Sequence, residues 1–131
     1  MSIVGHFING QVVETAERTQ DVFNPATGEV TRQVAIAAKS TVEEAIAAAQ
    51  AAYPAWRNTP PAKRAKIMFR FKQLLEDNAE KICALIGEEH GKISHDAMGE
   101  LTRGIENVEF ACSAPLMLKG EHSRNVGPGT P

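Results

Sequence analysis

The sequence predicts an α+β fold in which a short β unit comes first and about four helices follow. Between His6 and Ile36, apolar pairs and alternating positions are separated by Asn-Gly and Asn-Pro breakers, a pattern typical of strands and turns. From Ser40 onward, apolar residues recur every three or four positions, which is the period of a helix. The chain has 131 residues, the size of one ordinary domain, and its sequence has no internal repeat.

A β hairpin is predicted close to the start. Asn9-Gly10 stands between the apolar pairs 7–8 and 12–13, and both turn residues tolerate positive φ. Such a pair between apolar residues is a strong short-range indication of a hairpin.

Two further strands are expected around a turn. The segment 21–23 is followed by Asn-Pro-Ala-Thr-Gly at 24–28, which carries two breakers and a glycine suited to positive φ. Val30, Val34 and Ile36 then alternate with other residues, which predicts a strand with one mostly buried face.

The first helix is predicted to begin at Ser40, because Ser40 and Glu43 have the spacing of a capping box, and to end at Pro54. Thr59 is predicted to cap the second helix, with Pro60 in its first turn. The expected core stripe of that helix comprises Ile67, Met68, Phe71, Leu74 and Leu75.

The third helix is expected to start near Asn78 and to end at Gly91, and Ser94 is expected to cap the fourth, which runs until Pro115. The apolar positions of these two helices are Ile82, Leu85 and Ile86, then Leu101, Ile105, Val108 and Cys112. The tail at 120–131 is rich in Gly and Pro and is predicted to be extended or disordered.

Composition excludes several classes of protein. Hydrophobic residues make up 43% of the chain and the net charge is -2, which argues against a disordered chain and against a global field that would attract nucleic acid. No apolar run approaches the ~18 residues of a membrane span, and the start lacks the features of a secretory signal. We therefore expect a cytoplasmic protein that binds neither membrane nor nucleic acid.

The segment Gly87 to Lys92 resembles a phosphate loop only superficially. It has three residues between its glycines instead of four, and Ile93 stands where Ser or Thr would bind magnesium. We interpret it as a helix end, and the dinucleotide pattern G-x-G-x-x-G is also absent from the sequence. The four histidines have no ligand-like spacing, so no metal site is expected.

Cysteines and basic residues both favour structural roles. Cys83 and Cys112 continue apolar stripes, which indicates free, buried and inert thiols. A basic cluster on the second helix could contact phosphates, but the helix lacks exposed aromatic residues for base stacking, so a solvated face is favoured. The cluster comprises Lys63, Arg64, Lys66, Arg70 and Lys72.

The sequence allows two roles for Arg103. Glu100 and Glu106 flank it at i−3 and i+3, so it could form a surface ion pair of little energetic value. Gly104 beside it would let a ligand come close, and a guanidinium at such a gap could hold a carboxylate by two parallel hydrogen bonds. The spacing leaves both open.

Several stretches together resemble the amino-terminal region of the NAD-dependent aldehyde dehydrogenase superfamily. They are Phe7-Ile8-Asn9-Gly10-Gln11, Asn24-Pro25-Ala26-Thr27-Gly28-Glu29-Val30, the Ala-rich helix ending in Ala55-Trp56, and Glu89-His90-Gly91-Lys92. The segment from Arg103 to Cys112, with Ala114-Pro115 and Lys119-Gly120-Glu121, resembles the branch that acts on methylmalonate and malonate semialdehydes.

This resemblance implies part of an α/β fold with a modified Rossmann NAD-binding domain, and assembly as dimers or tetramers. In that branch a cysteine thiolate attacks the semialdehyde, hydride passes to NAD, and a thioester remains. Decarboxylation and transfer to coenzyme A then give propionyl-CoA or acetyl-CoA, in valine and inositol breakdown. The resemblance implies that Arg103 binds the substrate carboxylate.

The same resemblance places the catalytic cysteine and the nucleotide-binding strands beyond Pro131. We therefore expect residues 1–131 to be the amino-terminal part of the NAD-binding domain of a longer enzyme, inactive and without a bound cofactor when alone. The alternative is an inactive chain that serves as an interaction or assembly module. In either case, apolar helix faces without a partner sheet predict marginal stability or self-association.

Overall fold

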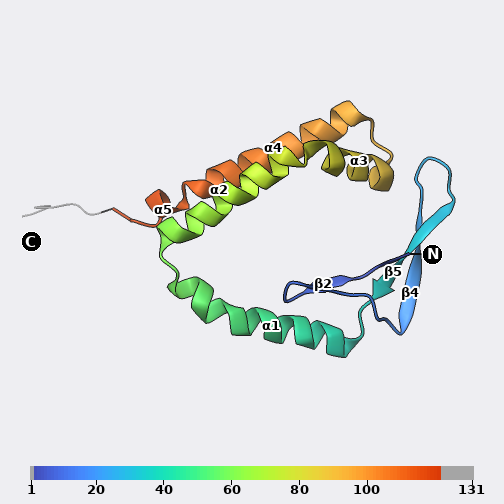
Figure 1. Cartoon of the computed structure of the whole chain (residues 1–131), viewed down its shortest axis with the longest axis horizontal. Helices are drawn as coiled ribbons and strands as arrows, with labels where there is room; N and C mark the ends of the chain where they lie inside the picture. The colour runs from blue at the N-terminus through green and yellow to red at the C-terminus, as the bar shows by residue number, and fades with distance from the viewer. Residues whose placement is uncertain (1, 122–131) are drawn as a thin grey trace, which may run out of the picture.

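The computed structural model describes residues 2–121 and confirms a β unit followed by helices (Figure 1). The strands are β1 (Ile3–Val4), β2 (His6–Ile8), β3 (Gln11–Val13), β4 (Arg18–Phe23) and β5 (Val30–Ile36). The helices are α1 (Lys39–Asn58), α2 (Pro61–Asp77), α3 (Ala79–His90), α4 (Ser94–Cys112) and the short α5 (Ala114–Met117).

The strands form two small sheets. In one, β5 lies between β1, which is parallel to it, and β4, which is antiparallel. In the other, β2 and β3 form the predicted hairpin, and its turn residues have positive φ, 50° at Asn9 and 79° at Gly10. Strand β1 was not predicted, because a two-residue strand paired in parallel with a distant segment leaves no local pattern.

The predicted turn between β4 and β5 is confirmed. The Asn24 side-chain oxygen accepts hydrogen bonds from the amides of Ala26 at 2.8 Å and Thr27 at 3.3 Å. Gly28 has a φ of 73°, which favours glycine, and its amide donates to the Asn24 carbonyl at 2.8 Å. The tip therefore closes through its own backbone and the Asn24 side chain.

The burial expected for β5 is wrong in detail. Val30, Val34 and Ile36 are only half-buried, whereas Ala35, on the opposite face of the strand, is 4% exposed. Alternation locates the two faces of a strand, but the elements that cover each face decide which one is buried.

Three predicted N-caps are not formed. The first helix begins at Lys39 after an extended Ala38, so Ser40 lies inside the first turn and the capping box is wrong. Thr59 caps the end of α1 instead of the start of α2. Ser94 is the first residue of α4, after Ile93. No side chain makes a cap hydrogen bond at these starts, since the chain enters each helix one or two residues away from the serine or threonine.

Pro54 does not end the first helix, which continues to Asn58. Proline removes one amide donor, but the final turn of α1 is closed by Thr59. Its amide donates to the Trp56 carbonyl at 3.1 Å and its hydroxyl to the Ala55 carbonyl at 2.9 Å. Pro61, rather than Pro60, then occupies the first position of α2.

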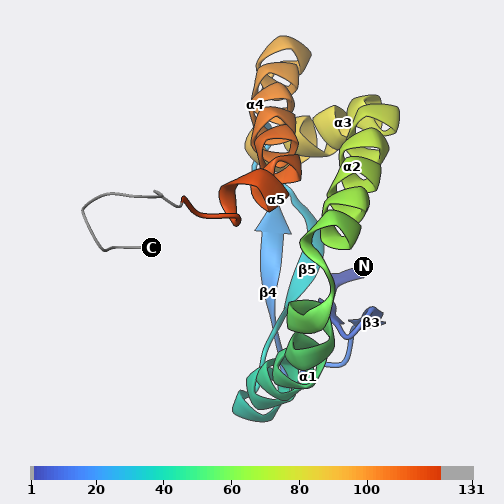
Figure 2. The same cartoon turned by 90° about the vertical axis from the view of Figure 1, so that its left-hand side faces the viewer.

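Helices α2, α3 and α4 pack together, and both views show α2 beside α4 (Figure 2). The centre of this bundle is a buried cluster of Cys83, Ala97 and Leu101, with Ala97 fully inaccessible. Ile82, Ile86 and Ile105 pack against the cluster, which confirms most of the predicted stripes of α3 and α4. Small residues at the centre let the helices approach closely.

The predicted stripe of α2 is only partly correct. Met68 and Leu75 are half-buried, but Ile67, Phe71 and Leu74 are exposed by 52%, 44% and 43%. Helix α2 presents its Met68 side to α4 and leaves the neighbouring apolar face uncovered.

The end of α3 matches the prediction. Gly91 is left-handed, with φ at 71°, and its amide donates to the Gly87 carbonyl at 2.8 Å. Helix α5, which contains Pro115, was not expected and makes five helices instead of four. Of the predicted tail, residues 122–131 lie outside the described residues. Within 2–121, none of the helices has the length and hydropathy needed to cross a membrane.

Large apolar side chains remain exposed over much of the surface. Helix α1 has no buried residue, and Ile46, Tyr53 and Trp56 on it are 53%, 57% and 43% exposed. Among the described residues, no large side chain is completely buried. Exposed apolar patches of this kind favour contact with further protein surface.

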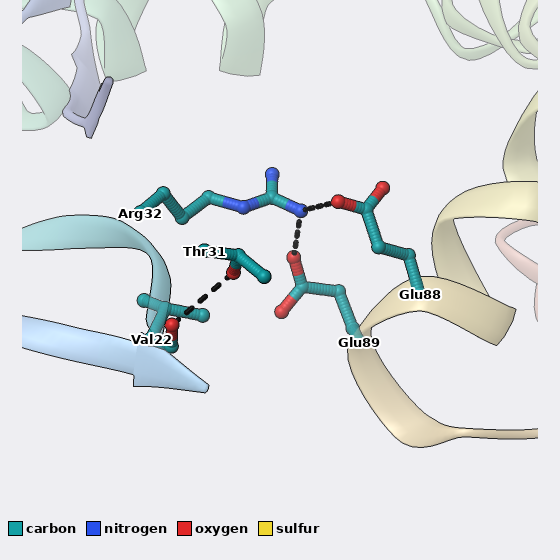
Figure 3. A network of polar contacts seen from close by, with 5 residues as sticks. All are labelled: Val22, Thr31, Arg32, Glu88 and Glu89. Carbon is teal, nitrogen blue, oxygen red and sulfur yellow. Dashed lines mark hydrogen bonds and ion pairs between the residues drawn. The ribbon is translucent and has the colours of Figure 1, made fainter. Parts of the chain in front are cut away.

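The β unit is held to the helical bundle by Arg32 on β5. Its Nη2 atom donates to Glu88 and lies 3.0 Å from Glu89, both at the end of α3 (Figure 3). The Arg32 side chain is 20% exposed. Close by, a Cβ atom on Gly91 would lie 3.3 Å from Cγ of Pro25, so the turn of the β unit sits directly against the helix end.

We expect the 131-residue chain to self-associate through its exposed apolar faces. Its sedimentation coefficient should rise with protein concentration, and replacing Ile67 and Phe71 together by Lys should reduce that rise. Replacing Thr102, an exposed polar residue of α4, by Lys serves as the control. A sharp monomeric melting transition that does not depend on concentration would contradict this expectation.

Replacing Arg32 by Gln should loosen the β unit from α3. We expect a loss of about 1 kcal/mol in the free energy of unfolding, since the ion pairs are partly exposed. Amide hydrogen exchange should quicken in β5 more than at the Cys83 cluster. Arg18→Gln, on the exposed edge of β4, is the matched control, and equal effects of both variants would rule out a special role for Arg32.

Candidate functional site

Arg103 lies near the middle of α4 and is exposed. It lies two positions from Leu101 and two from Ile105, so it occupies the helix face opposite the packed stripe. Its carbonyl accepts a hydrogen bond from the Asn107 side chain at 2.7 Å. Leu101 and Ile105 thus hold one face of α4 in the bundle, while Arg103 lies on the other face.

Neither flanking glutamate pairs with Arg103. Within residues 2–121, the ion pairs include none between its guanidinium and Glu100 or Glu106. Glu100 instead accepts a hydrogen bond from Nζ of Lys92, in the loop between α3 and α4. The surface ion pair that the spacing allowed for Arg103 is therefore not formed.

The hydrogen bond from Lys92 is the main reason that the pKa of Glu100 lies below its ordinary value of 4.5. The charges of Lys92, His90 and Arg103 lower it further, while desolvation opposes them. The pair therefore contributes its stability at pH values above 4.5 and loses it as the pH falls through the lowered pKa. At neutral pH, Glu100 is charged and held by Lys92.

Two glycines of α4 lie close to Arg103, Gly99 one turn before it and Gly104 directly after it. A Cβ atom added to Gly104 would meet nothing within 4 Å, and one added to Gly99 would lie 3.7 Å from Nη1 of Arg103. The Arg103 side chain therefore runs back along α4 over Gly99. A planar guanidinium in this setting can hold a carboxylate through two parallel hydrogen bonds.

Both cysteines are free and buried, as the sequence predicted, with exposures of 8% for Cys83 and 7% for Cys112. Each lies in a helix-packing face and presents no accessible thiol for attack on a substrate. No group of three or more His, Cys, Asp or Glu side chains gathers in a metal-binding arrangement in the part of the chain from 2 to 121. His122 lies outside the described residues.

The basic cluster of α2 is divided in its contacts. Arg64 is half-buried and stacks over Trp56, 5.8 Å from the ring centroid. Lys72 donates to Glu76 at 2.7 Å, which raises its pKa above 10.5. The other three residues of the basic cluster are exposed. The five cations do not form one continuous surface for phosphates.

An apolar pocket of about 210 Å³ lies where the end of α1 meets α2, α4 and α5. Its walls include Trp56, Met68, Ala111, Pro115 and Leu118. Arg103 is not part of this pocket, so the candidate site and the pocket are separate features of α4.

The contact between Lys92 and Glu100 was not predicted from the sequence. It lies eight positions before Glu100 and outside α4, so no helix spacing rule connects the two side chains. Gly91 was the available indication, because a left-handed helix end turns the following residues back toward the next helix.

Comparisons with known proteins agree with the fold. The Aldehyde dehydrogenase family pattern matches residues 12–130. The malonate-semialdehyde dehydrogenase of Pseudomonas aeruginosa is 61% identical over 128 residues, which are 98% of this chain and 26% of that protein.

Two solved structures extend the likeness. The methylmalonate-semialdehyde dehydrogenase of Oceanimonas doudoroffii superposes with a TM-score of 0.92 at 69% identity, covering 98% of this chain and 26% of the other. An NAD-dependent benzaldehyde dehydrogenase from Corynebacterium glutamicum superposes with a TM-score of 0.83 at 31% identity, covering 95% and 28%.

The chain thus spans about a quarter of the length of the curated relatives it matches. The family pattern nevertheless matches most of the chain, and the superpositions cover the β unit together with the helices. The chain belongs to the aldehyde dehydrogenase family.

Proposed function

We propose that this chain forms the amino-terminal part of the NAD-binding domain of an NAD-dependent, CoA-acylating methylmalonate- or malonate-semialdehyde dehydrogenase. The observation that carries the proposal is the 61% identity to a malonate-semialdehyde dehydrogenase along 98% of the chain. Semialdehydes of this class carry a carboxylate that has to be recognised beside the reacting aldehyde.

Arg103 is the residue that we assign to this carboxylate. Arg103 is exposed, the next residue Gly104 leaves the helix surface open, and Glu100 pairs with Lys92 instead of the guanidinium. A charge-assisted, two-point contact would fix the orientation of the substrate as well as add affinity. Cys83 and Cys112 are buried, so neither is proposed as the nucleophile.

The remaining chemistry is proposed for the longer enzyme. There, a cysteine outside this chain would form the thioester, NAD would accept hydride, and coenzyme A would accept the acyl group after decarboxylation. We assign no residue among 2–121 to either cofactor and expect the chain alone to be inactive. The proposed setting is a cytoplasmic homo-oligomer in valine and inositol breakdown.

A second candidate function is that of an inactive assembly module. It is favoured by the exposed apolar side chains of α1 and α2, which are suited to packing against another protein. Mixing the chain with a full-length aldehyde dehydrogenase and measuring co-sedimentation tests this function, and failure to form a complex would count against it.

The enzymatic proposal is tested by replacing the matching region of the Pseudomonas aeruginosa relative with this chain. We expect the hybrid to reduce NAD with methylmalonate semialdehyde and coenzyme A, whereas the 131-residue chain alone, with an intact mass near 14.2 kDa, should not. An inactive but correctly folded hybrid would count against the proposal.

In the active hybrid, Arg103→Ala should lower kcat/KM for malonate semialdehyde by about 10- to 100-fold, the loss expected for a hydrogen-bonded charge pair. Propionaldehyde, which has no carboxylate, should be affected far less. Arg70→Ala, at an exposed arginine of α2, is the control. Equal losses for both aldehydes would remove Arg103 from carboxylate recognition.

A further inference from the structure

Lys92 stands beside the proposed site without belonging to it. It follows Gly91, whose φ of 71° ends α3 and turns the chain toward α4. From this loop, Nζ of Lys92 reaches Glu100, one helical turn before Arg103. Their side chains are 33% and 37% exposed, so the pair is partly shielded from water.

Glu100 is the residue that could compete with an external carboxylate for the Arg103 guanidinium. Residues at i and i+3 are neighbours on a helix surface, and a glutamate placed before its cation is the more favourable order. Glu106 follows Arg103 and has the less favourable order. An unpaired Glu100 would therefore be the carboxylate best placed to neutralise the guanidinium.

We propose that Lys92 is a positioning residue that holds Glu100 and thereby keeps Arg103 free for an external carboxylate. This inference rests on the proposed role of Arg103 and adds to it a residue that does not touch the substrate. Lys92 acts by holding the Glu100 carboxylate away from Arg103. Replacing Lys92 should therefore not change ligand binding once Glu100 has also been replaced.

The lowered pKa of Glu100 agrees with this arrangement, since the bond from Lys92 is its largest cause and the charge of Arg103 its smallest. Without Lys92, the pKa of Glu100 should move up toward 4.5, and its carboxylate should turn to the remaining cation nearby. His90 also lowers this pKa and would still act on Glu100.

The test uses the 131-residue chain with malonate as the probe and NMR detection of the Arg103 Nε–Hε group. In Lys92→Gln, we expect malonate to bind roughly twofold more weakly, the strength of one competing ion pair on a helix surface. In Lys92→Gln/Glu100→Gln, binding should return to the value of the unmodified chain. Lys92→Arg should preserve it, and Lys119→Gln controls for the loss of an exposed positive charge.

A direct NMR measurement of the contact between Arg103 and Glu100 distinguishes this inference from the proposed function. The charges of Arg103 and Glu100 already interact in the unmodified chain. In Lys92→Gln, the Arg103 signal should therefore shift with pH as Glu100 titrates by more than it does in the unmodified chain, and this increase is the added coupling. If this added coupling appears although the unmodified chain does not bind malonate, the positioning role of Lys92 stands and the carboxylate-binding role proposed for Arg103 loses support from the chain alone. Absence of the added coupling, or a double variant that remains as weak as Lys92→Gln, would overturn the inference.

Discussion

The arrangement of the molecule depends on the contact of Arg32 with the end of α3. The β unit and the helical bundle each pack internally, and Arg32 joins them through Glu88 and Glu89. The same helix end carries Gly91, which rests against Pro25 and turns the chain toward α4. One corner of the structure thereby fixes both the docking of the sheet and the path of the loop that holds Lys92.

That loop links packing to the proposed chemistry. Leu101 and Ile105 bury one face of α4 in the bundle, which leaves Arg103 on the other face. On this outer face, Glu100 at i−3 is a neighbour on the same helix that could pair with Arg103. In our proposal, the bond between Lys92 and Glu100 prevents this pairing, so the loop that ends α3 also keeps Arg103 available.

A second feature of the structure is the apolar surface that remains exposed. The buried residues of the core are small, Leu101 excepted, and large side chains such as Phe71 and Trp56 remain accessible. Apolar area left in water contributes nothing to folding, so these faces favour further protein contacts. Membership of the aldehyde dehydrogenase family is consistent with this surface, since its relatives are about four times as long as the chain.

The sequence by itself determined the elements whose causes are local. The hairpin at Asn9-Gly10, the turn at Asn24 and the end of α3 at Gly91 follow from backbone preferences, and the stripe of α4 follows from helical periodicity. Tertiary structure alone decided the rest. Ala35 is buried instead of Val34, Thr59 caps α1, and Glu100 pairs with Lys92 rather than Arg103, because each outcome depends on which segment lies opposite.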